Sequence, residues 1–165
     1  MSRPTTRPRL SQIDPAAVGR EVEQALVSSY AQARAAVLPA VAAAHALATY
    51  ARDGVSPGRS VGELLGEIAP LWRAPMRGAR APEVEVDPLT GLGLAVLGAL
   101  GREAIDEGYR IPLRGLAVLG GVHLEYLRQL GRRGDILVVD GAVRARDARM
   151  WLASRGVAGY GEDGC

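Results

Sequence analysis

Two side chains near the C-terminus, Arg128 and Gln129, have the chemistry to bond the edges of DNA bases. A guanidinium can donate two hydrogen bonds to guanine, and a carboxamide can pair in the same two-point way with adenine. Arg132 and Arg133 follow closely, and we expect these cations to contact phosphates, which position a protein without specifying sequence. His123 precedes the group and is a candidate helix cap or phosphate contact, with an unpartnered surface histidine as the alternative.

These side chains are predicted to lie on a helix over 123–132, the second of two helices joined by a tight turn. Two helices that cross need a small residue at the crossing and a turn residue that tolerates a positive φ, and Ala117 and Gly121 supply both. Gly120 stands where an apolar side chain is more usual. The apolar residues expected between the two helices are Leu116, Val122, Leu127 and Leu130.

A β-hairpin is predicted directly after the helix pair, over 136–144. Two short apolar runs are joined there by Asp140 and Gly141, and the Asp-Gly pair favours a type I′ turn because both residues tolerate a positive φ. Arg144 and Arg146 follow the hairpin, where we expect them to lie near the sugar-phosphate backbone of DNA. An amphipathic helix over 145–155 should pack back on this unit.

The order helix, turn, helix, hairpin, helix over 111–156 resembles the winged helix-turn-helix proteins of the excisionase and MerR-like type. The matching features are a Gly-Val turn at 121–122, an Arg-Arg-Gly helix end at 132–134 and an Ala-Arg-x-Trp-Leu sequence at 148–152. The resemblance implies a DNA-binding regulator or a phage- or plasmid-type accessory factor. It implies that helix 123–132 enters the major groove of double-stranded DNA, that the wing 136–144 contacts the backbone, and that the protein binds as a dimer or beside neighbouring copies.

The rest of the chain predicts a helical body, so the expected fold class is mainly α: a helical N-terminal body followed by a small winged helix-turn-helix with one β-hairpin. The 165-residue sequence has an apolar fraction of 48%, which is enough for a core of Leu, Val and Ala. We divide the chain into a flexible basic tail (1–13), a helical region (14–72), a linker (73–88), the winged unit with its preceding helix (89–157) and a second tail (158–165).

Local signals place the helices of the body. Asp14 before a proline predicts a helix start, because its carboxylate can cap free backbone N–H groups. Pro39 is expected to break or kink the Ala-rich stretch, and Pro70 to limit the helix that the capping box Ser60 to Glu63 opens. The predicted helices run over 15–37, 40–52, 60–71 and 89–107, with Gly54 and Gly108 as stops after the second and the fourth.

The sequence argues against catalysis. His45 and His123 are the only histidines, and a chain without lysine cannot form a Gly-rich phosphate loop that ends in lysine. No histidine and carboxylate have the spacing of metal ligands, and Cys165 is a single cysteine, so neither a metal centre nor an intrachain disulfide is expected. The glycines at 91–98 follow no predicted strand, which disfavours a dinucleotide cofactor.

Charge and hydropathy limit the class of partner. The net charge of +2 is small, but seven arginines face four acids between residues 120 and 155, so the C-terminal region is locally basic. No apolar run reaches the roughly 20 residues that span a bilayer, and no secretory signal follows the N-terminal cations. We therefore expect a cytoplasmic protein with no membrane contact.

Two functions from different classes stay open. The first is sequence-specific DNA binding, which Arg128 and Arg132 favour. The second is a non-catalytic protein-interaction module of the antitoxin, immunity or adaptor type, which keeps the winged fold and holds a protein partner through Leu124, Tyr126 and the Ala-rich helix. Glu125 on the candidate recognition helix favours the second, because an acid is repelled by phosphates. The apolar stripe of 15–52 also predicts a homodimer.

Overall fold

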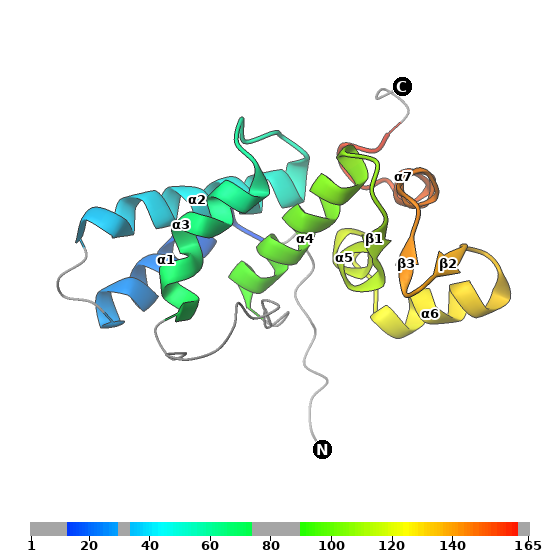
Figure 1. Ribbon diagram of the computed structural model, residues 1–165, viewed down its shortest axis with the longest axis horizontal. Helices are drawn as coiled ribbons and strands as arrows, with labels where there is room; N and C mark the ends of the chain where they lie inside the picture. Colours follow the sequence, from blue (N-terminus) through cyan, green and yellow to red (C-terminus); the bar gives the residue numbers. More distant parts are fainter. Residues whose placement is uncertain (1–12, 30–33, 74–89, 162–165) are drawn as a thin grey trace, which may run out of the picture.

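The computed structural model describes residues 13–29, 34–73 and 90–161. Four helices come first: α1 (Pro15–Ser29), α2 (Arg34–Asp53), α3 (Val61–Arg73) and α4 (Gly91–Asp106). A smaller unit follows, with β1 (Ile111–Pro112), α5 (Leu113–Leu119), α6 (Leu124–Arg133), β2 (Val138–Val139), β3 (Ala142–Val143) and α7 (Ala145–Ser154). The predicted fold class, a helical body followed by a small unit with a β-hairpin, is confirmed (Figure 1).

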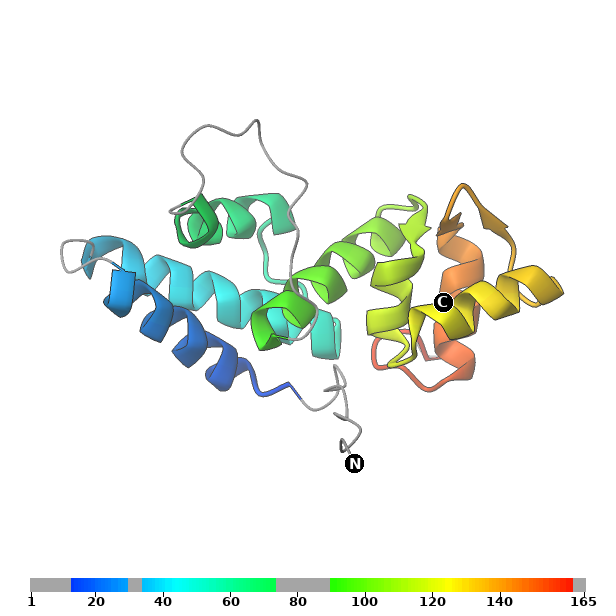
Figure 2. The same cartoon turned by 90° about the horizontal axis from the view of Figure 1, so that it is seen from below.

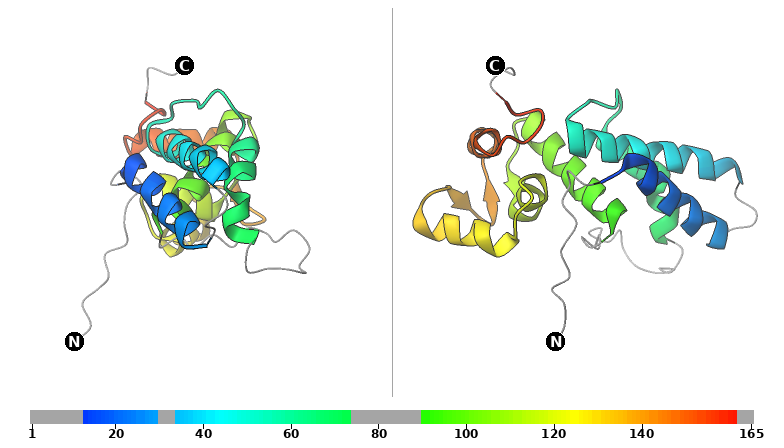
Figure 3. Two further views of the ribbon diagram at one scale, coloured as in Figure 1. Left: turned by 90° about the vertical axis from the view of Figure 1, so that its left-hand side faces the viewer. Right: turned by 180° about the vertical axis from the view of Figure 1, so that it is seen from behind.

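The helix α4 joins the two halves of the molecule. It packs against α2 on one side and against α5 and α7 on the other, and Figure 3 shows it running between the body and the C-terminal elements. Gly101 of α4 allows the close approach, because a Cβ there would lie 3.1 Å from Ile111 Cδ1 and 3.2 Å from Leu119 Cδ1. The predicted boundary between the halves, 73–88, lies outside the described residues beyond Arg73.

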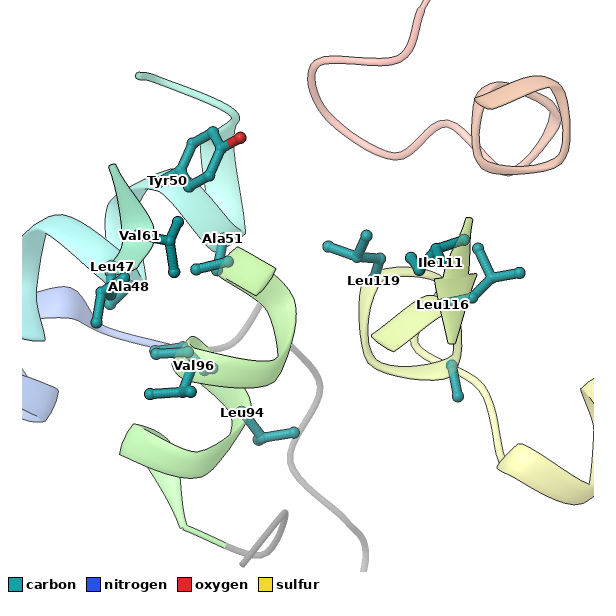
Figure 4. Close-up of a cluster of buried hydrophobic side chains, with 14 of the residues drawn as sticks. Leu47, Ala48, Tyr50, Ala51, Val61, Leu94, Val96, Ile111, Leu116 and Leu119 are labelled. Carbon is teal, nitrogen blue, oxygen red and sulfur yellow. The ribbon is translucent and has the colours of Figure 1, made fainter. Parts of the chain in front are cut away.

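Buried side chains form one continuous core through both halves. In the body, Leu47 and Ala51 of α2 meet Val96 of α4, while Ile111 and Leu116 gather at the junction of β1 and α5 (Figure 4). Small residues dominate the α2 and α4 surfaces that face each other, so the two helices can lie close together. This explains how a chain with no phenylalanine fills its interior.

The prediction that Pro39 divides the Ala-rich stretch is wrong. The helix α1 ends at Ser29 and α2 begins at Arg34, with residues 30–33 outside the described ranges, and Pro39 lies inside α2. A proline within a helix costs about 3 kcal/mol because it removes one hydrogen bond and crowds the preceding turn. Pro39 is exposed, and burial of Ala44, Leu47 and Ala48 elsewhere on α2 offsets that cost.

The capping signals are confirmed where the structure describes them. The backbone N–H of Ala16 donates to the Asp14 carboxylate at 3.0 Å. Ser60 and Glu63 form the reciprocal capping box: the Glu63 N–H donates to Ser60 Oγ at 3.2 Å, and the Ser60 N–H to Glu63 Oε2 at 2.9 Å. The backbone and hydroxyl of Ser60 lower the pKa of Glu63. Pro70 does not limit this helix, because α3 continues to Arg73.

The sheet has one strand more than predicted. Its order is β1-β3-β2, and both neighbours pair antiparallel to β3, with Val143 opposite Ile111 on one side and Val138 on the other. The hairpin between β2 and β3 forms as expected, with Asp140 and Gly141 at φ +54° and +72°. The sheet therefore ties the start of the C-terminal unit to its hairpin.

One charged side chain, Arg102 of α4, is buried within the described ranges, at 2% exposure. It donates to the carbonyls of Ala51 at 2.9 Å, Arg52 at 3.2 Å and Ala158 at 2.7 Å, and its guanidinium lies 4.8 Å from the centre of the Tyr160 ring. Tyr160 is itself buried. The segment that was predicted to be a second tail, 158–165, is thus packed against the body at least through Tyr160.

Candidate nucleic-acid interface

The turn between α5 and α6 has the geometry that the sequence predicts. After α5 the N–H of Val122 donates to the Ala117 carbonyl at 3.0 Å and the N–H of Gly121 to the Val118 carbonyl at 3.2 Å. This pair of bonds is a Schellman motif, which requires a left-handed residue at the position of Gly121. Gly121 adopts φ +61° there. The chain then reverses into α6 within four residues, Gly120 to His123.

The structure gives a reason for glycine at position 120. A Cβ at Gly120 would lie 2.5 Å from two carbons of the Trp151 ring, so the indole of α7 fills the place where an apolar side chain was expected. Arg155 contacts both residues: its guanidinium lies 5.1 Å from the centre of the Trp151 ring and its Nε donates to the Gly120 carbonyl at 3.3 Å. The turn is thereby fixed against α7.

The buried and exposed faces of α6 are close to those predicted. Leu127 and Leu130 are buried at 0% and 8% exposure, and Leu116 of α5 is buried as well. Leu124 was expected to point outward, but it is half-buried and packs against the core. The exposed residues of α6 and its cap are His123, Glu125, Tyr126, Arg128, Gln129, Arg132 and Arg133. In the view from below, α6 lies in front of the unit (Figure 2).

The predicted site residues fall into two groups. His123 occupies the N-cap position of α6 without a side-chain capping bond, and the four other predicted residues of this helix follow it on exposed positions. Arg144 occupies the N-cap position of α7, and Arg146 lies exposed in the first turn. Figure 1 shows α6 and α7 on opposite sides of the strands. The structure therefore collects the candidates of α6 on one helix and places the other two at the start of α7.

A carboxylate connects two of the candidate cations on α6. Glu125 Oε2 lies 3.3 Å from Arg128 Nη1, and Glu125 Oε1 lies 3.1 Å from Arg132 Nη1. All three side chains are about half exposed or more, at 52%, 53% and 71% for Glu125, Arg128 and Arg132. The spacings of three and seven residues place them on one face of the helix. The sequence shows this spacing, although from the sequence alone Glu125 is predicted only to oppose DNA binding.

Other arginines of the basic region are used within the fold. Arg149 donates to the Ile105 carbonyl at 3.2 Å and lies 3.7 Å from the Asp106 carboxylate, which ties α7 to the end of α4. Arg155 donates to the Gly120 carbonyl, and Arg110, which precedes the basic region, lies 3.9 Å from Asp140 at the hairpin turn. The locally basic composition of residues 120 to 155 is thus divided between internal contacts and the exposed row on α6.

Comparison with family models, with curated proteins and with solved structures finds no match to this chain. None of the helices in the described part of the chain combines the length and apolarity needed to cross a membrane. In the same residues, no three His, Cys, Asp or Glu side chains gather as metal ligands would.

Proposed function

We propose that the protein binds double-stranded DNA in a sequence-specific way, as a transcription regulator or a phage- or plasmid-type accessory factor. The observation that carries the proposal is the exposed polar face of α6, in which Arg128, Gln129, Arg132 and Arg133 stand on the second helix of a helix-turn-helix. The buried side chain of Leu127 packs the opposite face of that helix into the core. In this motif the second helix is the one that enters the major groove.

The dimensions and chemistry of α6 suit that role. A helix of ten residues is about 15 Å long, and the major groove, about 12 Å wide, admits one helix. Arg128 and Gln129 can then bond guanine and adenine edges, while Arg132 and Arg133 contact phosphates. The hairpin β2–β3 follows α6 directly and pairs with β1, an arrangement that suits a wing beside the DNA backbone.

A second candidate function is the non-catalytic protein-interaction module, which exposed apolar residues of the same unit favour. Tyr126 is 42% exposed on α6, Leu137 is 56% exposed before β2, and Met150 is 63% exposed on α7. Isolated apolar residues are common on protein surfaces, so this observation weighs less than the row of cations. A protein partner would make the affinity depend on Tyr126 rather than on Arg128.

Homodimerisation through the Ala-rich stretch stays a prediction, and the structure leaves less apolar surface for it than the sequence indicates. Val18, Val22, Ala44 and Leu47, which form much of its apolar stripe, are buried within the chain. Outside 25–37, where the structure describes the side chains of this stretch, much of the stripe is covered by the protein's own helices. Sedimentation over a range of concentrations tests the remaining possibility, and a constant monomer mass would reject the dimer.

The proposal is tested by fluorescence anisotropy on duplexes that the wild-type protein selects from a random pool, over a salt series. We expect Arg128→Ala to weaken binding to the selected duplex by about 1–3 kcal/mol. Arg133→Ala should weaken binding to all duplexes by a similar amount and reduce the slope of log affinity against log salt concentration by about one. The matched control is Arg20→Ala, which removes the same charge from an exposed position of α1. Absence of duplex binding at low salt, or an equal effect of Arg20→Ala and Arg128→Ala, would reject the proposal.

A further inference from the structure

The ion pairs of Glu125 bear on which bases α6 would recognise. In the free protein one carboxylate accepts from both guanidiniums, at 3.3 Å for Arg128 and 3.1 Å for Arg132. Each carboxylate oxygen accepts from one arginine, and along the helix the three charges follow in the order negative, positive, positive. This row lies at 52% to 71% exposure, where it can meet a partner without rearrangement of the core.

Such a row is poorly suited to phosphates alone. A backbone phosphate is repelled by Glu125 and must compete with its carboxylate for each guanidinium, so the carboxylate lowers affinity for DNA of any sequence. A base edge differs, because it presents donors as well as acceptors. The exocyclic amine of cytosine donates to a carboxylate, while N7 and O6 of guanine accept from arginine.

The spacing along α6 agrees with neighbouring bases. Residues three apart on a helix are separated by about 4.5 Å along its axis, which is near the base-pair step of about 3.4 Å. Glu125 and Arg128 can thus contact adjacent base pairs. Arg132 lies two helical turns from Glu125, about 10.5 Å along the axis, and extends beyond them toward the backbone.

We infer that Glu125 is a specificity-determining residue of α6, which selects a cytosine next to the guanine contacted by Arg128 and lowers binding to unrelated DNA. The inference rests on the proposed DNA binding and assigns a base preference to the same helix. It assigns to Glu125 the selection of a base, a role that the net charge of the chain does not predict. An exposed carboxylate that held its arginines for stability alone would leave base preference unchanged when it is replaced.

The test compares the duplexes selected from a random pool by wild type, Glu125→Gln and Asp135→Asn. Asp135 is an exposed acid just beyond α6, so its replacement removes the same charge from the same unit. We expect Glu125→Gln to bind unrelated duplexes more tightly, to lose about tenfold in the ratio of selected to unrelated affinity, and to shift one position from cytosine toward adenine, the base that a carboxamide prefers. Asp135→Asn should keep the wild-type preference.

The outcomes separate this inference from the proposed function. If wild type and Glu125→Gln select the same bases with the same affinity ratio, the role of Glu125 is refuted while DNA binding stands. The same holds if Asp135→Asn changes the base preference as much as Glu125→Gln does. If none of the three proteins retains a duplex at low salt, the proposed function fails and the inference falls with it.

Discussion

Arg102 and Arg128 are the same type of side chain on two helices of this chain, and their surroundings are opposite. Arg102 is 2% exposed and its partners are backbone carbonyls and an aromatic ring, whereas Arg128 is 53% exposed and its partner is the Glu125 carboxylate. The first arrangement belongs to the fold. In the second arrangement, another anion can take the place of the Glu125 carboxylate as the partner of Arg128.

The partners of Arg102 explain why it is fixed. The carbonyls of Ala51 and Arg52 lie in the last turn of α2, where helix carbonyls lack partners within the helix and the helix dipole is negative. Arg102 supplies donors to both, and its bond to Ala158 adds the C-terminal segment. An exposed ion pair such as Glu125 with Arg128 contributes only about 0–1 kcal/mol, so DNA can replace it at little cost.

The largest effect should come from Arg102→Met, which keeps an apolar stem but removes every donor. Three carbonyls then lose a charge-assisted hydrogen bond from a buried guanidinium, and the stacked Tyr160 loses its partner. We expect the free energy of unfolding to fall by about 3 kcal/mol, measured by urea denaturation. A loss below about 1 kcal/mol would show that Arg102 is no more structural than Arg128.

Glycine replacements next to Arg102 should have the second-largest effect. Gly54 has φ +75°, and a Cβ there would lie 2.8 Å from Arg102 Nη1. Gly58 has a similar φ of +69°, but a Cβ there would have no atom within 4 Å, so it serves as the control. Both Gly54→Ala and Gly58→Ala incur a backbone cost of about 1 kcal/mol. We expect Gly54→Ala to cost about 1 kcal/mol more in urea denaturation. Equal losses would mean that the guanidinium moves aside freely.

The contrast between the two arginines also shows what the sequence could predict. Local signals were sufficient for the turn at Gly121, the hairpin at Asp140 and Gly141, and the capping box at Ser60, because each depends on the conformation of a few adjacent residues. Arg102 gave no such signal. Its burial depends on carbonyls more than fifty positions away in either direction, which no local pattern encodes.

The same limit applies to the candidate interface. The exposed positions Arg128, Gln129 and Arg132 follow from the helical period and the buried Leu127, so they could be predicted. The sequence does not predict the strand β1, because a run of two residues, Ile111 and Pro112, is too short to show an alternating pattern. Its pairing depends on β3, which lies about thirty positions later. Gly120 was unexpected for a related reason, since Trp151, thirty-one positions later, occupies its space.

The third prediction concerns alkaline pH and the phenol beside Arg102. Burial raises the pKa of Tyr160 from its ordinary value near 10 to about 12, and burial and the bond to Asp106 also raise the pKa of Tyr50. A raised folded pKa means that stability is complete below pH 10 and is lost as the pH rises toward 12. At pH 11 the loss from Tyr160 alone should be about 1 kcal/mol.

This loss can be measured cleanly because the chain has no lysine to titrate in the same range. Urea denaturation at pH 8 and pH 11 gives the size of the loss in the free energy of unfolding, and tyrosinate absorbance shows the ionisation of the tyrosines that cause it. Tyr160→Phe is the matched control, since it keeps the ring next to Arg102 and removes a hydroxyl that is buried without a hydrogen-bond partner among the described residues. An unchanged alkaline loss in Tyr160→Phe would contradict the assignment.

The smallest effect on stability should come from Arg128→Ala, although its effect on DNA affinity is expected to be large. Its side chain is 53% exposed and its partner Glu125 keeps a second arginine, Arg132, so no buried group loses a partner. We expect the free energy of unfolding to change by less than about 0.5 kcal/mol in urea denaturation. A loss near that of Arg102→Met would place Arg128 within the fold, and any weaker DNA binding would then report unfolding instead of a lost base contact.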